Sequence, residues 1–253
     1  MTTLGSPRHL AAAALAAALA GCATTPSPGN DIATSPWADQ SGLHAAGQVT
    51  TWTHQQFPGK VPTQFAYARN DGRDAVAVRA NASASMLRQV VRIEPQDLGH
   101  VRFSWRVPAL IEQADLATRE HDDAPVRLVL AFEGDRSRFS AKDAALSELA
   151  LALTGEPMPY ATLMYVWCNK RAPGTVIGSP RTDRIRKLVV ESGAARLDKW
   201  LDYERDIRAD YERVFGEAPG ALVGIGIMTD SDNTHSQARA WYGPIRFLPV
   251  AAR

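Results

Sequence analysis

Residues 230–234 are the densest group of side chains in this sequence that could do chemistry. Asp230 and Asp232 supply two carboxylates, and Asn233 follows with an amide. Such hard oxygen atoms are the ligands that calcium takes in proteins, but the glycine and the closing glutamate of an EF-hand loop are missing, which excludes that module. Three interpretations remain: a turn whose side chains bond their own backbone, a contact with a ligand or partner, and a weak calcium site on Asp230 and Asp232. The sequence indicates no other cofactor.

Asp122 and Asp123 form a second acidic group. Adjacent side chains on a strand point to opposite faces, so these two can serve one site only from a loop, which the proline shortly after them favours. If this loop met Asp230 and Asp232, the carboxyl groups could act as the acid and base of a glycoside hydrolase or a lyase. The alternative is a solvated loop.

Aromatic side chains form a third group. Flat rings stack on sugars in carbohydrate-binding sites, but the same rings fill the cores of β-sandwiches. Trp241 and Tyr242 are neighbours, so a regular strand would bury one ring and could expose the other. Trp105 shares a face with apolar residues and is expected in the core. The candidate binding residues are therefore Asp123, Asp230, Asp232, Asn233, Trp167, Trp241 and Tyr242.

The N-terminus carries the chemistry of a lipid anchor. The segment Leu19-Ala20-Gly21-Cys22 has the form of a lipobox, preceded by Arg8 and an alanine-rich apolar run. That run is too short to be a permanent membrane span and is typical of a cleaved signal peptide. We expect a signal peptide at residues 1–21, palmitate on Cys22 and a flexible tether over residues 22–48. Because no aspartate follows the cysteine, Gram-negative sorting favours the outer membrane, with the protein facing the periplasm.

Composition excludes one class of partner. Lysine and arginine total 28 against 27 acidic residues, a formal net charge of +1, and no long basic run occurs. Nucleic acid is therefore not an expected partner, and membrane association is expected from the lipid. With Cys22 acylated, Cys168 has no disulfide partner. It follows an apolar run and is expected as a buried structural thiol, with a catalytic thiolate as the alternative.

Alternation of apolar and polar residues indicates strands through the rest of the chain. Within residues 101–107, the odd-numbered positions are apolar and share one face. Further runs of this kind occupy residues 64–69, 75–80, 87–93, 126–132, 161–167, 185–191, 222–228 and 237–247. About nine short strands without alternating helices predict one domain at residues 49–253, mainly β, folded as an antiparallel, jelly-roll-like β-sandwich with two short helices.

Glycines and helix signals predict further details. Asn70-Asp71-Gly72 is typical of a hairpin turn. Gly224 and Gly226 lie on one face of their strand, where they would let another backbone or a ligand approach closely. The two helices are expected at residues 141–153 and 208–215, each closed by a glycine.

Several motifs occur in order along the C-terminal half. They lie at residues 154–167, 200–206, 210–217, 228–234 and 241–243, with Trp105-Arg106-Val107 and Asp122-Asp123 upstream. Together they resemble the bacterial family known as domain of unknown function 3047, over roughly residues 50 to 250. That family implies no activity here. The closing strand, which ends in Ile245-Arg246-Phe247, is similar to galactose-binding-type jelly rolls, which include many carbohydrate-binding modules; this likeness concerns the fold and does not define a function.

These features favour a lipid-anchored cell-envelope protein that binds a glycan or another envelope component without catalysis. The first alternative is a glycoside hydrolase or lyase that uses Asp122, Asp123, Asp230 and Asp232, whose carboxyl groups would then lie about 5–9 Å apart in one cleft. The second is a purely structural envelope lipoprotein. No serine-hydrolase elbow, zinc-protease helix, phosphate loop or dinucleotide fingerprint occurs in the sequence.

Overall fold

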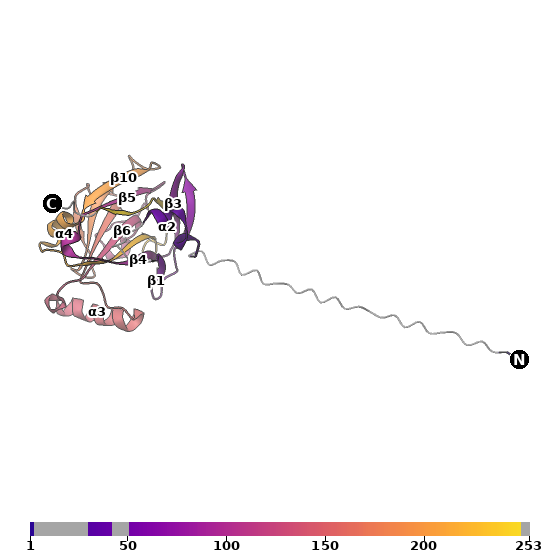
Figure 1. Cartoon of the computed structure of the whole chain (residues 1–253), viewed down its shortest axis with the longest axis horizontal. Helices are drawn as coiled ribbons and strands as arrows, with labels where there is room; N and C mark the ends of the chain where they lie inside the picture. Colours follow the sequence, from indigo (N-terminus) through magenta and orange to yellow (C-terminus); the bar gives the residue numbers. More distant parts are fainter. Residues whose placement is uncertain (3–29, 42–50, 249–253) are drawn as a thin grey trace.

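Strands with one apolar face dominate the protein and pair into two sheets. The computed structural model describes residues 1–2, 30–41 and 51–248. The latter two ranges form a sandwich of two β-sheets with helices around it (Figure 1). The predicted signal peptide and Cys22 lie outside the described residues.

The first sheet has seven strands. In spatial order they are β1 (Thr53–Gln56), β4 (Ser85–Ile93), β11 (Leu222–Asp230), β6 (Ala124–Phe132), β7 (Ala161–Cys168), β9 (Ile185–Ser192) and β8 (Val176–Gly178). All neighbours are antiparallel except β7 and β9. After β7 the chain forms β8 at the edge and then returns between the two as β9, so β9 runs parallel to β7.

The second sheet has six strands. Five lie in the order β10 (Leu201–Asp206), β5 (His100–Arg106), β12 (Gln237–Tyr242), β3 (Arg73–Asn81) and β2 (Gln64–Asn70), and β13 (Arg246–Leu248) also pairs with β5. The predicted hairpin joins β2 to β3. Asp71 and Gly72 at its turn have φ values of 48° and 77°, which is the left-handed geometry that tight hairpins require.

The core lies between the inner faces of the two sheets. Trp105 is completely buried, as its position among apolar residues predicted. Its strand neighbour Phe103 stacks on Tyr165 of the opposite sheet, with ring centroids 5.7 Å apart and planes 10° from parallel. The mainly β sandwich predicted from the sequence is confirmed.

Two helices match the predicted ones. They are α3 (Ala141–Thr154) and α4 (Ile207–Phe215), and Gly155 and Gly216 close them in the left-handed conformation, with φ values of 77° and 72°. The remaining helical segments are α1 (Asn30–Ala33), α2 (Pro36–Gln40) and the 3-10 turns η1 (Pro95–Asp97), η2 (Arg119–His121) and η3 (Arg136–Arg138). Among the described residues, none of the helices combines the length and the apolar character that crossing a bilayer requires.

The folded unit begins earlier than residue 49. Helices α1 and α2 lie in the segment assigned to the tether, yet Ile32 and Trp37 are completely buried in the main core. The Trp37 ring lies 4.8 Å from that of Trp52, and the Ile245 N–H donates to Ser41 Oγ at 3.1 Å. Two large apolar side chains and polar contacts of Gln40 and Ser41 dock this segment, which average composition did not reveal.

Candidate functional site

The outer face of the seven-stranded sheet carries a groove of about 970 Å³. Directly paired residues of neighbouring strands share a face, so the strand register gives the rows that cross this surface. From the α3 end inward, the rows are Val90, Gly224, Ala131 and Thr162; then Arg88, Gly226, Val129 and Met164; then Met86, Met228, Arg127 and Val166. All but Arg127 and Val166 line the groove.

Gly224 and Gly226 form part of the groove floor. The strand face on which the sequence predicted a close approach of a backbone or a ligand therefore lines the groove. A Cβ atom at Gly224 would meet Ala131 Cβ at 3.5 Å, an ordinary contact. At Gly226 it would lie 2.5 Å from Met86 Sδ. Gly224 therefore keeps the floor low, whereas Gly226 makes room for the methionine beside it.

Methionines make up much of the remaining lining. The chain has five methionines, and all four beyond Met1 line this groove: Met86, Met158, Met164 and Met228. A methionine side chain is apolar, unbranched and polarisable, so it adapts to ligands of irregular shape. These residues do not stand out as a group in the sequence, because only the sheet register and the segment after α3 bring them together.

The rim of the groove is charged, and the two arginines that β4 contributes to it are paired with glutamates. The Arg88 guanidinium donates to both carboxylate oxygens of Glu156, at 2.7 and 2.6 Å. Arg92 lies 3.0 Å from Glu133. These pairs mark the edge between an apolar interior and water. One wall comes from α3 and the segment after it, through Ala150 and Thr154 among others.

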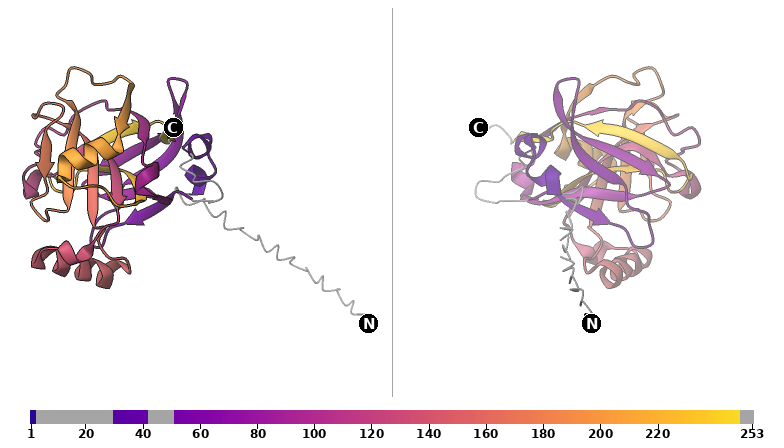
Figure 2. Two further views of the ribbon diagram at one scale, coloured as in Figure 1. Left: turned by 60° about the vertical axis from the view of Figure 1, so that its left-hand side comes forward. Right: turned by 90° about the vertical axis from the view of Figure 1, so that its right-hand side faces the viewer.

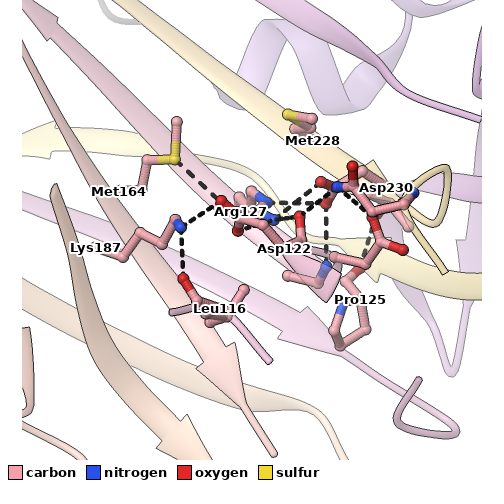
Figure 3. Close-up of polar contacts among 12 residues, drawn as sticks. Leu116, Asp122, Pro125, Arg127, Met164, Lys187, Met228 and Asp230 are labelled. Atoms are coloured by element: carbon pink, nitrogen blue, oxygen red, sulfur yellow. Dashed lines mark hydrogen bonds and ion pairs between the residues drawn. The ribbon is translucent and has the colours of Figure 1, made fainter. Parts of the chain in front are cut away.

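A buried ion network lies where the groove ends, beside Met164 and Met228 (Figure 3). Arg127 donates from Nε to Asp230 Oδ1 at 2.8 Å and from Nη2 to Asp230 Oδ2 at 2.9 Å. Its Nη2 also lies 3.1 Å from Asp122 Oδ1. Lys187 Nζ donates to the other oxygen of Asp122 at 2.6 Å. Both cations are almost completely buried.

Burial and neighbouring charges explain the pKa values of this network. The carboxylates of Asp122 and Asp230 share the two buried cations, and an oxygen of Asp123 lies within 4.8 Å of one of Asp230. Burial, together with the neighbouring carboxylates, raises the pKa of Asp230 to about 6 despite its contact with Arg127. Burial and the charge of Arg127 lower the pKa of Lys187 to about 8. Although burial opposes it, the charges of Arg127 and Lys187 hold the pKa of Asp122 below its usual value.

The two acidic loops meet in space. Carboxylate oxygens of Asp123, Asp230 and Asp232 lie within 4.8 Å of one another, a spacing that a cation site would need. Internal donors already serve these oxygens, however. Asp123 accepts from Thr234 N at 2.7 Å and from Thr234 Oγ1 at 2.6 Å.

The other members of the acidic cluster also have internal partners. Asn233 Nδ2 donates to Asp123 Oδ1 at 3.1 Å, and Lys60 Nζ donates to Asp232. Arg127 on Asp230 and Lys60 on Asp232 therefore supply the positive charge that a bound cation would otherwise bring. The geometry therefore favours the structural interpretation of residues 230–234, in which they form a loop held together by its own polar contacts.

The predicted aromatic binding residues lie in different environments. Trp167 is 1% exposed and Tyr242 2%, so neither ring offers a face to a ligand. The Tyr242 hydroxyl accepts from the Arg127 N–H at 3.1 Å and donates to the Met228 carbonyl at 2.6 Å. Trp241 is half-buried on the six-stranded sheet, with the Arg106 guanidinium 5.6 Å from its ring centroid. The candidate residues therefore do not form one site.

The fold and the site define a β-sandwich with an apolar groove on one outer face. The chain belongs to the family described as protein of unknown function (DUF3047), whose model matches residues 50–246. The predicted family membership is thus confirmed. No curated protein matches this sequence.

Several solved structures resemble this chain at low similarity. One is the native endo-1,4-β-glucanase CelB2, a cellulase, with 8% identity over 80% of this chain and 93% of that chain, and a TM-score of 0.43. A chain from a comparison of family 12 glycoside hydrolases has 8% identity over 84% and 98%, with a TM-score of 0.42. The xyloglucanase domain of NopAA, a type three effector from Sinorhizobium fredii in complex with cellobiose, has 10% identity over 79% and 94%, with a TM-score of 0.40. Likeness at this level identifies neither a ligand nor a reaction.

Proposed function

We propose that this protein is a lipid-anchored protein of the cell envelope that binds an elongated, mainly apolar envelope component in the outer-face groove. One observation carries the proposal: all four methionines beyond Met1 and the two floor glycines, Gly224 and Gly226, line a single groove of about 970 Å³. That volume is within the range of ligand sites, whose lining is mostly apolar with a few polar groups at the edge.

The groove suits an acyl chain better than a sugar. Sugars are held by exposed aromatic faces and by free polar groups. Phe57 and Phe132 are the aromatic residues among those that line the groove, and Phe132 is completely buried in the core. The rim arginines Arg88 and Arg92 are engaged by glutamates. A lipid therefore fits this lining better than the glycan that the sequence favoured.

A hydrolase that uses the acidic loops has one observation in its favour, which is that Asp123, Asp230 and Asp232 converge. The proposal without catalysis is preferred because Asp123 and Asp230 are 1% and 3% exposed. A substrate would have to displace Arg127 and the 230–234 loop before it reached either carboxylate. Anchorage at the outer membrane, facing the periplasm, remains part of the proposal on the basis of the lipobox.

Blocking the groove tests the proposal. The chain from residue 22, with Cys22→Ser, is titrated with the fluorescent fatty acid cis-parinaric acid and separately with cello-oligosaccharides. In Gly224→Leu the new Cβ atom would meet nothing closer than Ala131 Cβ at 3.5 Å, the new side chain would occupy the groove floor, and we expect affinity for the fatty acid to fall at least about tenfold.

Gly178→Leu is the matched control. Gly178 lies in β8 of the same sheet, has open space around it and does not line the groove. This variant should bind like the parent protein. Equal loss of affinity in both variants, or binding of the oligosaccharide with no affinity for the fatty acid, would reject the groove as an apolar site.

A further inference from the structure

Helix α3 buries polar residues and exposes leucines, the reverse of an ordinary surface helix. The helix positions that are buried against the body are polar, Asp143 and Ser147, at 2% and 5% exposure. Leu149, Leu151 and Leu153 are instead 53%, 42% and 61% exposed. A surface helix normally buries its leucines and exposes its polar residues, so α3 presents to solvent the side chains that would gain most from leaving it.

Polar contacts dock α3 on the body, and the exposed leucines are not needed for that. Asp143 accepts from Ser140 Oγ at 2.8 Å and from Thr182 Oγ1. Arg136 Nη1 donates to Ser147 Oγ at 2.9 Å. Figure 1 and Figure 2 show α3 outside the two sheets, at one end of the sandwich.

The exposed leucines lie on opposite sides of the helix. Leu149 and Leu153 are one turn apart and share a side, whereas Leu151 points to the other side. No charged residue occurs between Glu148 and Glu156. A flat protein surface would cover only one of these sides. A medium that surrounds the helix end covers both, and the hydrocarbon of a membrane is such a medium.

The expected anchor keeps the folded body near a bilayer. If Cys22 is acylated, the chain between it and Asn30 spans at most about 30 Å when fully extended. The body would therefore stay near the lipid surface. The groove opens on the same side as α3, because Ala150 and Thr154 of the helix line it.

We propose that residues 149–154 of α3 insert into the interfacial region of the bilayer, so that the groove opens directly onto lipid. This inference rests on the proposed function, since it names the surface from which the groove would receive its ligand. The segment is about 9 Å long, which matches the depth that interfacial helices reach and is far too short to span the membrane.

Membrane depth measurements test the insertion. The chain from residue 22, with Cys22→Ser to remove the lipid, is mixed with vesicles of phosphatidylethanolamine and phosphatidylglycerol that carry brominated acyl chains. Tryptophan fluorescence of Leu151→Trp should be quenched on vesicle addition. The control is Val176→Trp, at an exposed valine of β8 outside the groove, and its fluorescence should change no more than that of the parent.

A second comparison uses vesicle co-sedimentation. Replacing Leu149, Leu151 and Leu153 together by glutamine should weaken the partition into vesicles at least about tenfold. Val61→Gln, at another exposed valine, should leave it unchanged. Because all four positions are exposed, circular dichroism is expected to be the same for each variant.

The two proposals fail separately. Binding of cis-parinaric acid in vesicle-free buffer with no quenching of Leu151→Trp would overturn the insertion and leave the groove ligand intact. Quenching without fatty-acid binding would overturn the proposed ligand alone. Equal vesicle binding by the triple-glutamine variant and the parent would also reject insertion.

Discussion

At the scale of single residues, the acidic side chains are explained by their partners. A buried carboxylate is costly unless it is paired and hydrogen-bonded. Asp230 Oδ1 accepts from Arg127 Nε at 2.8 Å and from the Ala124 N–H at 3.1 Å. Asp123 closes the 230–234 loop through Thr234 and Asn233. Groups that looked reactive in the sequence are therefore occupied in holding two loops together.

The raised pKa of Asp230 predicts a pH dependence of stability. A pKa near 6 in the folded protein exceeds the ordinary carboxyl value of 3.8. The group therefore favours folding below about pH 4 and loses this contribution as the pH rises through 6. Between about pH 4 and pH 7, the free energy of unfolding of the wild type should fall by about 2 kcal/mol relative to Asp230→Asn. Urea unfolding of both proteins across this range measures the difference, and a wild type that instead gains stability would contradict the raised pKa.

At the scale of elements, the short N-terminal helices belong to the sandwich. Trp37 on α2 is completely buried against Trp52. Its burial explains why the folded unit extends upstream of residue 49. The hydrophobic contribution comes from one large ring, so it does not depend on the length of the helix.

Removing that ring tests the domain boundary. Trp37→Ala should lower the free energy of unfolding by about 3–5 kcal/mol, because it leaves a cavity in the main core. A chain that starts at residue 49 should lose at least as much. Val61→Ala, at a side chain that is 61% exposed, serves as the control and should change stability by less than about 0.5 kcal/mol. Urea denaturation midpoints that are equal for Trp37→Ala and Val61→Ala would restore the boundary predicted from composition.

At the scale of the whole molecule, the protein combines an expected lipid anchor with a groove and an exposed apolar helix. These three features suit a molecule that works at a lipid surface, and each alone would be ambiguous. The expected membrane localisation depends on acylation of the Cys22 thiol. The other thiol, that of Cys168, is buried and free, which agrees with the structural role expected for it.

Acylation of Cys22 can be measured in cells. Wild-type protein should incorporate an alkynyl palmitate label and partition into detergent, whereas Cys22→Ser should do neither. Cys168→Ser is the matched control and should keep the label, because its side chain lies in the folded body. Label retained by Cys22→Ser, or a wild type that stays unlabelled in the aqueous phase, would rule out the anchor.

Local pattern allowed most of the fold to be predicted. The period-two runs located the larger strands, such as β5 and β6, and glycines closed α3 and α4 at the expected places. Short edge strands such as β1 and β8 were missed because a few residues show no periodicity. The parallel pairing of β7 and β9 was missed because it depends on the order in which the chain fills the sheet edge.

The sequence by itself determined the pattern of the larger strands, the family and the shared face of Gly224 and Gly226, since each is written in residues that are neighbours along the chain. Only the tertiary structure decided which acidic residues are buried in ion pairs, that four distant methionines share one groove and that α3 faces its leucines outward. The physical reason is that burial and contact between distant segments follow from sheet register and packing, which local periodicity does not contain.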